Sequence, residues 1–410
     1  MAILGSIRKE KQIFYLALSA AFRGLRDNLR FVIWQPFALS LGVSMSSIGA
    51  LESLMDVAKT AVQPVFGAAS DTYGRKRFLI FRDALIVVAG VCFLFAKSFT
   101  LLAIGMTLIG FSVALIPVWS SIVAESASGF EMGMIYSLMG SSYMALGLIG
   151  TLSGGYLASI LGYSIVYIIF TVLGILSLLL LVFKVSETHR GTTEKHFTIE
   201  TAVKSFLDAF RPPRYLWGYY IAMSVDLFAF SLGWRLLNGM LTESYGYTPY
   251  MLGVMNSVSF GMQAIAQIFL GRHVDRVGYV KYLALSQSIS CLVIALIIWN
   301  PSFVVVVAAN FLMGIGAALW SPAEQAWMAR NVETSSRGKL FGGFNTFRGL
   351  IALPAPIIGG VLYDISGFHL PLLINLVLAA IDVGLLLFLV KETVRPDIVK
   401  TESKLVTGDA

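Results

Sequence analysis

Long apolar segments recur along the whole of this 410-residue chain, and they limit its fold more than any other feature. A membrane-spanning helix needs about 20 mostly apolar residues, and a lipid bilayer admits only helices and closed barrels. Segments of sufficient length lie at residues 13–41, 45–67, 79–96, 99–123, 133–159, 163–184, 214–242, 249–271, 282–299, 302–327, 339–363 and 369–390. The chain is 57% hydrophobic and only 13% charged, whereas about a quarter of a soluble domain is charged. We therefore predict an all-α polytopic membrane protein with twelve transmembrane helices.

The basic residues are divided unevenly between the two sides of this topology. Loops on the side of the N-terminus hold most of them, including Arg75 to Arg77, whereas the opposite loops hold only Lys97. Because cytoplasmic loops are enriched in Lys and Arg, both termini are expected to be cytoplasmic. The same asymmetry accounts for most of the net charge of +7, so nucleic-acid binding is not expected. We predict a monomeric, multi-pass protein of a bacterial or archaeal plasma membrane.

A polar stretch at residues 185–213 separates six predicted spans from six. Its part TIETAVKSFLDAF has helical spacing, which predicts an amphipathic helix on the cytoplasmic membrane surface. The expected organisation is an N-terminal six-helix bundle at 1–184, this linker, a C-terminal six-helix bundle at 214–391 and a cytoplasmic tail at 392–410.

An internal repeat relates the two halves. At a shift of 204 residues, Gly49, Gln63, Gly67, Asp71, Gly74, Arg77 and Gly110 match Gly253, Gln267, Gly271, Asp275, Gly278, Lys281 and Gly314. At a shift of 205, Pro117, Gly133, Gly154, Gly155 and Gly162 match Pro322, Gly338, Gly359, Gly360 and Gly367. Because six spans are an even number, both halves begin on the same side of the membrane. The repeat therefore predicts two parallel, pseudo-symmetric bundles.

The loop after the second span, GAASDTYGRKRFLI at 67–80, has a degenerate copy, GRHVDRVGYVKYL, at 271–283. Motif, topology and repeat together resemble the major facilitator superfamily over nearly the whole chain. The resemblance implies a secondary transporter in which this loop is a latch that breaks and re-forms as the halves rock. The expected latch residues are Gly67, Asp71, Gly74, Arg75, Lys76, Arg77, Arg82, Gly271, Asp275 and Gly278. Asp71 is expected to meet a helix N-terminus or an arginine such as Arg82.

A second motif of this superfamily, typical of antiporters in the fifth span, is only half present. Thr151 occupies the position where that motif has proline. The remaining glycines of this span, Gly147, Gly150, Gly154 and Gly155, are expected to form a seam for close helix packing.

The first two spans carry charged stripes. Arg23, Arg26, Asp27, Arg30 and Trp34 fall within about 100° of arc on the first span, and Glu52, Asp56, Lys59 and Gln63 within about 60° on the second. Such stripes must face protein or a water-filled cavity. The resemblance places both spans at a central cavity.

Two interpretations of these charges remain open. In one, the charges neutralise each other, as Arg23 with Asp27, Asp27 with Arg30 and Asp56 with Lys59. In the other, arginines bind an anionic substrate group, because the guanidinium fork matches carboxylate and phosphate. The candidate substrate-binding residues are Arg23, Arg26, Arg30, Trp34, Arg235, Asn256, Asn345 and Arg348. The candidate proton-coupling residues are Asp27, Glu52, Asp56 and Glu324. Asp382, on the twelfth span, is expected to be structural.

Other chemistry is not expected. The chain has no phosphate-binding loop for ATP, no metal-ligand spacing among its four histidines and no catalytic motif, so neither an enzyme nor a cofactor is predicted. The first hypothesis is proton-coupled transport of a small organic anion or zwitterion by alternating access. The alternatives are a proton-coupled multidrug efflux antiporter and a non-transporting membrane sensor. The expected partners are a small-molecule substrate, the coupling proton and the lipid bilayer.

Overall fold

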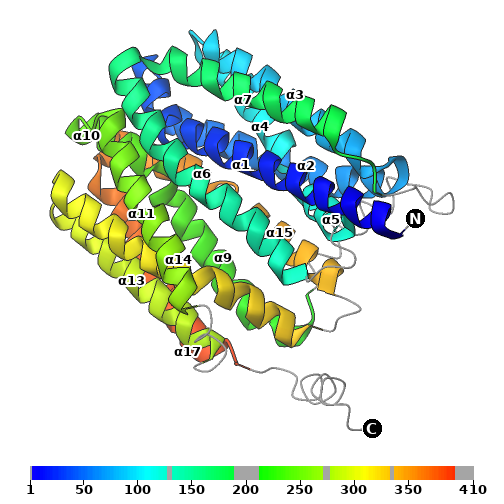
Figure 1. Ribbon diagram of the computed structural model, residues 1–410. Coiled ribbons are helices and arrows are strands. Elements are labelled where there is room, and N and C mark those ends of the chain that lie inside the picture. Colours follow the sequence, from blue (N-terminus) through cyan, green and yellow to red (C-terminus); the bar gives the residue numbers. More distant parts are fainter. Residues whose placement is uncertain (1, 127–131, 189–211, 271–277, 333–336, 393–410) are drawn as a thin grey trace. The chain divides into compact units, whose positions relative to one another are not determined.

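The computed structural model describes residues 2–126, 132–188, 212–270, 278–332 and 337–392, and these residues form helices and no strand (Figure 1). The predicted amphipathic helix of the linker, the residues of the tail after Glu392, Gly271 and Asp275 lie outside the described residues.

The helices follow the predicted spans closely. The first half contains α1 (Ala2–Ser40), α2 (Met45–Tyr73), α3 (Arg75–Leu94), α4 (Phe99–Val113), α5 (Ile116–Ser126), α6 (Met132–Leu161) and α7 (Tyr163–Lys184). The second half contains η1 (Arg214–Leu216), α9 (Trp217–Leu232), η2 (Trp234–Leu236), α10 (Leu237–Tyr245), α11 (Pro249–Leu270), α13 (Tyr279–Trp299), α14 (Phe303–Asn331), α15 (Arg337–Ala352), α16 (Ala355–Ser366) and α17 (His369–Leu389).

Eight helical segments of the described residues are long and apolar enough to cross a membrane. Helices α1, α2, α3 and α11 have comparable length but carry more polar side chains. Together they account for the twelve predicted spans. Two spans are each built from two helices, α4 with α5 and α15 with α16, and the span Arg214–Tyr245 is built from η1, α9, η2 and α10. Pro117 and Pro356 lie in the first turns of α5 and α16, where a missing backbone N–H costs least.

The internal repeat is visible in the backbone. The glycines with positive φ among the described residues form three pairs, Gly42 with Gly246, Gly74 with Gly278, and Gly162 with Gly367. Each pair has the 204- or 205-residue shift found in the sequence, and the φ values lie between 67° and 109°. Only glycine adopts this region without strain, so the repeat fixes equivalent turns in the two halves.

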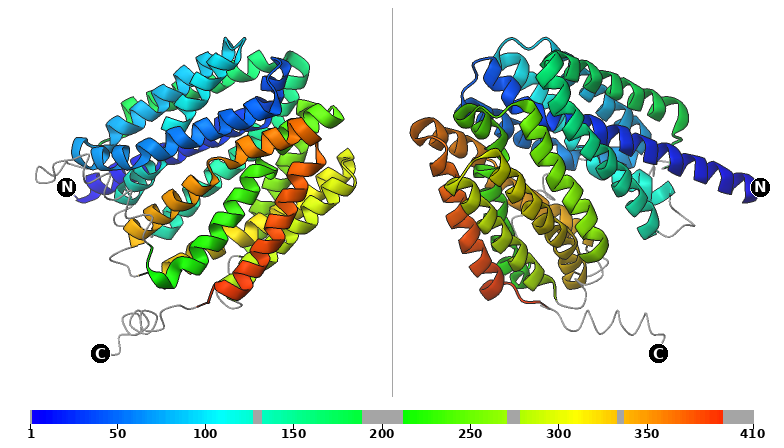
Figure 2. Two further views of the ribbon diagram at one scale, coloured as in Figure 1. Left: turned by 180° about the vertical axis from the view of Figure 1, so that it is seen from behind. Right: turned by 60° about the vertical axis from the view of Figure 1, so that its left-hand side comes forward.

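The chain divides into two compact units, which are described separately. The first unit comprises Met1–Ala202 and Asn238–Ser257, and the second comprises Val203–Leu237 and Val258–Ala410. In the first unit, α1 lies beside α6 and α7, as Figures 1 and 2 show. In the second unit, α17 packs against α9 and α13.

The glycine seam of α6 is a close-packing surface, as predicted. A Cβ atom on Gly150 would lie 2.5 Å from the carbonyl oxygen of Leu25, and one on Gly154 would lie 2.9 Å from that of Leu29. Helix α1 contributes Gly24, where a Cβ would lie 2.1 Å from the carbonyl oxygen of Tyr143. Small residues therefore let α1 and α6 approach at backbone distance, which positions the charged stripe of α1 inside the first unit.

Candidate functional site

Arg26 is the most deeply buried charge on α1. Its side chain has no solvent exposure, and its Nε donates to Oδ1 of Asp27 at 2.9 Å. Its Nη1 lies 3.9 Å from Oδ1 of Asp83 on α3. Of the two open interpretations, the one that pairs Asp27 with Arg23 and Arg30 is not seen among the described residues, because Asp27 accepts from Arg26 instead. Asp27 keeps 37% of its side chain exposed.

Asp83 links three helices of the first unit. Its carboxylate accepts hydrogen bonds from Nε of Arg82 at 2.9 Å and from the hydroxyl of Ser177, on α7, at 2.6 Å. Arg82 thus pairs with Asp83, whereas its expected partnership with Asp71 stays a prediction, because the side chain of Asp71 lies outside the described residues. Sequence analysis missed Asp83. Its signal was the adjacent pair Arg82–Asp83 within an apolar segment.

The other two arginines of the α1 stripe have no carboxylate partner within ion-pair distance among the described residues. The guanidinium of Arg23 lies 5.0 Å from the ring centre of Trp119 and 5.2 Å from that of Tyr143. Its Nε and Nη1 are buried and have no hydrogen-bond partner in the described part of the chain. Nη1 of Arg30 contacts the sulfur of Met106 at 3.8 Å. Of the four arginines Arg23, Arg26, Arg30 and Arg82, only Arg26 and Arg82 therefore have a carboxylate partner among the described residues.

The second predicted stripe is buried at Glu52 and Asp56 and partly exposed at Lys59 and Gln63. Glu52 and Asp56 are 4% and 9% exposed. Nζ of Lys59 donates to Oδ1 of Asp56 at 3.1 Å, as predicted from their spacing. Trp34, a candidate for substrate binding, is 3% exposed and belongs to the core of the first unit.

The predicted latch contains an acid that sequence analysis missed. Glu187 accepts hydrogen bonds from the backbone N–H groups of Arg75 and Lys76, at 3.1 and 2.9 Å, and so caps the N-terminus of α3 after Gly74. Nε of Arg75 lies 2.9 Å from Oε1 of Glu125, at the end of α5. Gly67 is helical and Arg77 is exposed.

The same cap recurs in the second unit. Glu392 accepts from the backbone N–H groups of Tyr279 and Val280, at 2.6 and 3.0 Å, next to Gly278. Extending the repeat to VSETHRG at 185–191 and VKETVRP at 390–396 would have identified both glutamates.

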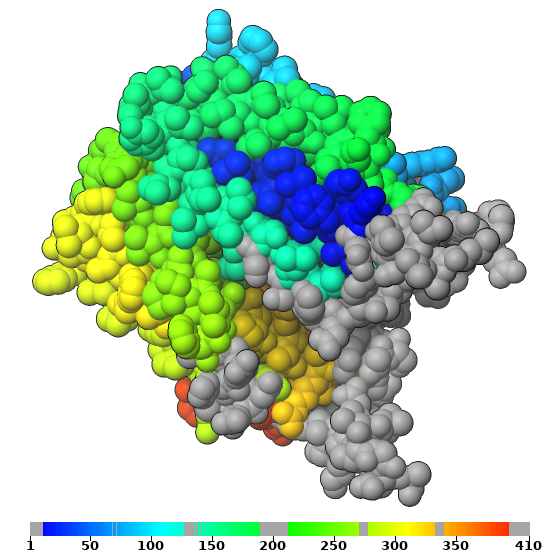
Figure 3. Space-filling view, in the orientation of Figure 1, coloured from blue at the N-terminus to red at the C-terminus, as the bar shows by residue number. Residues whose placement is uncertain are grey.

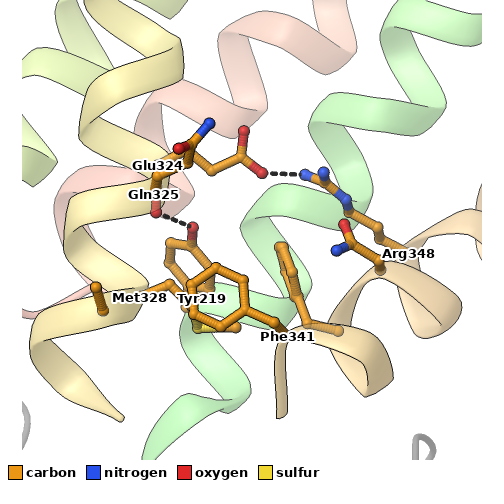
Figure 4. A pocket seen from close by; sticks show the side chains of 9 residues that line it. Tyr219, Glu324, Gln325, Met328, Phe341 and Arg348 are labelled. Carbon is orange, nitrogen blue, oxygen red and sulfur yellow. Dashed lines mark hydrogen bonds and ion pairs between the residues drawn. The ribbon is translucent and has the colours of Figure 1, made fainter. Parts of the chain in front are cut away.

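The second unit holds two cavities that share one ion pair. Nη1 of Arg348, on α15, donates to Oε1 of Glu324, on α14 (Figure 4). The other oxygen of Glu324 accepts from the indole N–H of Trp320 at 3.1 Å, and the Arg348 guanidinium lies 4.7 Å from the ring centre of Phe344. Glu324 and Arg348 therefore form a fixed polar contact between two helices.

A cavity of about 500 Å³ lies on the side of this pair toward the end of α14. It is lined by Tyr219, Gln325, Met328, Phe341 and Asn345 as well as by the pair. The hydroxyl of Tyr219 donates to the backbone oxygen of Glu324 at 3.2 Å, as Figure 4 shows.

The other cavity, of about 320 Å³, extends toward the middle of α14. Its polar lining includes Asp226, Gln263, Ser286, Gln287, Ser290 and Ser321, and its apolar lining includes Phe230, Met313 and Trp320. Arg235 and Asn256 line neither of these two cavities. Asn256 instead donates to Oδ1 of Asn238 at 3.2 Å within the first unit.

Asp382 on α17 is fully buried, and neither of its carboxylate oxygens has a hydrogen-bond partner among the described residues. Among the described residues, Asp226 on α9 and the thiol of Cys291 on α13 are close enough to interact with it electrostatically. Across the described residues, no group of three or more His, Cys, Asp or Glu side chains is placed to hold a metal ion.

The family model of the Major Facilitator Superfamily matches residues 16–233 and again residues 224–407. The chain belongs to the major facilitator superfamily. It is thus a multi-pass membrane transporter, and the double match agrees with the repeat seen in the backbone.

Relatives of this superfamily member span almost its full length. It is 22% identical over 360 residues to an uncharacterized MFS-type transporter, MJ1560, of Methanocaldococcus jannaschii, covering 87% of this chain and 92% of the relative. It is 24% identical over 356 residues to the multidrug resistance protein MdtG of Proteus mirabilis, covering 87% and 85%. Among solved structures, the nucleoside transporter NupG (D323A mutant) matches with a TM-score of 0.73 at 15% identity, covering 92% of this chain and 98% of that one.

Proposed function

We propose that this transporter moves a small organic anion or zwitterion across the plasma membrane by proton-coupled alternating access, with both termini in the cytoplasm. The observation that carries the substrate class is the excess of arginine inside the first unit. Among the described residues, Arg26 and Arg82 pair with Asp27 and Asp83, whereas Arg23 and Arg30 contact Trp119 and Met106 and have no ion pair. A cation within the membrane interior is costly unless it meets an anion or water.

The chemistry of arginine favours carboxylate or phosphate as that anion. Its planar guanidinium presents paired N–H donors that match two oxygens of one group. Two buried nitrogens of Arg23 have no acceptor among the described residues, and Arg30 contacts only a weak acceptor, the sulfur of Met106. Arg30, which is partly exposed, is the proposed substrate contact, whereas the fully buried Arg26 holds the cluster together.

Coupling to protons is proposed to use carboxylates that can exchange an arginine or lysine partner for a proton. Glu324 is the leading candidate because its ion pair with Arg348 borders both cavities of the second unit. Protonation of Glu324 would release the guanidinium of Arg348 to an anionic ligand. The buried acids Glu52 and Asp56 on α2 are the second candidates, since they lie one turn apart.

A multidrug efflux antiporter is the second candidate function. Phe230, Met313 and Trp320 give the smaller cavity an apolar wall, which suits flat, apolar ligands. The relative from Proteus mirabilis is named a multidrug resistance protein, and another relative, from Staphylococcus aureus, a quinolone resistance protein.

Transport by purified protein in liposomes would decide between these functions. We would measure uptake of radiolabelled carboxylates, organic phosphates and amino acids, and of cationic dyes, with and without a pH gradient. Accumulation of an anion or zwitterion that needs the gradient supports the proposal. Transport of cationic dyes alone, unaffected by Arg30→Gln, would contradict the anion proposal and favour the efflux antiporter.

A further inference from the structure

A basic cavity lies at one end of the first unit, away from the charged cluster of α1. It has a volume of about 360 Å³ and is lined by Lys11, Gln12, Tyr15, Lys76, Phe183 and Lys184, together with Val185 and Ser186 after α7. Three helices contribute these residues. Helix α1 contributes at Lys11, where its described side chains begin, α3 contributes at its start, and α7 contributes at its end. Figure 3 shows the described part of α1 at the surface between α6 and α7.

The charge of this cavity is positive. Among the described residues, three lysines and no acidic residue line it, and none of the ion pairs involves these lysines. Lys76 is held in place because its Nζ donates to the backbone oxygen of Val182 at 2.8 Å. The carboxylate of Glu187, close by in sequence to Lys184, is occupied by the N–H groups at the start of α3.

Hydrogen bonds fix the helices that form the walls of the cavity. The Gln12 side chain donates to the hydroxyl of Ser126 at 2.9 Å and accepts from the backbone N–H of Ser186 at 3.3 Å. These contacts tie α1 to the end of α5 and to the segment after α7. The lysines therefore line a pocket whose wall at Gln12 is fixed by hydrogen bonds.

The surroundings of the cavity are apolar. Phe183, which lines it, is 74% exposed, and Phe14, on the same stretch of α1, is 61% exposed. Large exposed aromatic side chains on membrane-spanning helices lie against lipid, and Tyr15 adds an amphipathic ring of the type found at membrane interfaces. A ligand in this cavity would thus meet cations at one end and acyl chains at the other.

We propose that this cavity binds the phosphate headgroup of an anionic phospholipid, with Lys11, Lys76 and Lys184 as its contacts. Basic pockets between transmembrane helices at a membrane surface recognise such headgroups electrostatically. A free inorganic phosphate would satisfy the lysines but would leave the exposed ring of Phe183 unused. This lipid-site proposal is independent of the substrate proposed for transport.

Native mass spectrometry and thermal unfolding of the full chain in detergent test this site. We expect phosphatidylglycerol to be retained and to raise the unfolding temperature more than phosphatidylcholine or inorganic phosphate does. The double variant Lys11→Gln/Lys184→Gln is expected to bind phosphatidylglycerol about 30-fold more weakly, from roughly fivefold for each lysine. The charge-conserving double variant Lys11→Arg/Lys184→Arg should bind phosphatidylglycerol as the unmodified protein does. This result would show that the glutamine variant loses binding through its lost charge and not through misfolding.

The matched control is Lys281→Gln, which removes an exposed lysine from α13 in the second unit. It should leave phosphatidylglycerol binding unchanged. Equal stabilisation by inorganic phosphate would show a free-phosphate site, and equal retention of phosphatidylcholine would show no selection for charge; either result overturns the proposal. Unchanged binding by the double glutamine variant would overturn it as well.

Discussion

Arg348 and Glu324 form an ion pair between α15 and α14 that borders both cavities of the second unit. A contact in this position can hold the two helices together and can also expose a cation to either cavity when it breaks. The side chains are 21% and 18% exposed, so water reaches the pair from the cavities. This partial exposure makes the exchange of a proton at Glu324 physically accessible.

Glu324→Gln is expected to remove the pH dependence of transport while substrate exchange persists. The amide cannot take up a proton, and the unpaired Arg348 should bind anionic ligands more tightly. The free energy of unfolding should decrease by roughly 1–3 kcal/mol, a loss of stability between those expected for exposed and for buried ion pairs. Exchange and pH-gradient-driven uptake in liposomes are the measurements. Full pH-driven accumulation by the variant would exclude Glu324 as the coupling site.

Arg30→Gln and Arg26→Gln should have different effects, although both remove an arginine from the same face of α1. Arg30→Gln should weaken binding of a carboxylate-bearing substrate about 30-fold or more, from a charge-assisted contact of roughly 2–5 kcal/mol, and spare its neutral ester. Arg26→Gln should instead destabilise the protein by about 3–5 kcal/mol, because it breaks a buried pair. Ligand binding and thermal unfolding of both variants separate the two. Equal loss of anion and ester binding in Arg30→Gln would assign that arginine a structural role.

Asp83→Asn and Asp382→Asn form a second matched comparison. Both carboxylates are fully buried, but Asp83 contacts two arginines and a serine, whereas Asp382 has no hydrogen-bond partner among the described residues. Asp83→Asn should cost about 3–5 kcal/mol through the arginines it leaves unpaired. Asp382→Asn should cost much less, since no cation depends on it. Denaturant unfolding of both variants measures the loss of unfolding free energy. A larger loss for Asp382→Asn than for Asp83→Asn would show that Asp382 has a partner among the residues that the structure does not describe.

Glu187→Gln in the first half and Glu392→Gln in the second half should lower the free energy of unfolding by similar amounts. Each glutamate caps the N-terminus of a helix after a glycine with positive φ, so neutralising it should cost about 0.5–2 kcal/mol. Hydrogen exchange of the first turns of α3 and α13 should increase in the respective variant only. Protection that stays unchanged in α3 of Glu187→Gln would show that another group caps that helix.

The sequence alone determined the spans, the repeat and the positions of the tight turns. Long apolar segments can satisfy their backbone in a membrane only as helices, so α7 begins and ends at the predicted residues. The glycines of the repeat marked turns with positive φ, and the spacing of Asp56 and Lys59 predicted their contact on one helix face. Local rules suffice for these features because each depends on neighbours within one or two turns.

Tertiary structure decided which charges meet. A helical wheel places Arg26 on a face but says nothing of the helix that lies opposite, and Asp83 and Ser177 belong to α3 and α7. The pairing of Arg26 with Asp27, and of Arg348 with Glu324, likewise depends on packing that rotates each helix against its neighbours. Long arginine side chains reach several acceptors at similar cost, so burial and the positions of distant carboxylates select the partner, and these are fixed only when the bundle has folded.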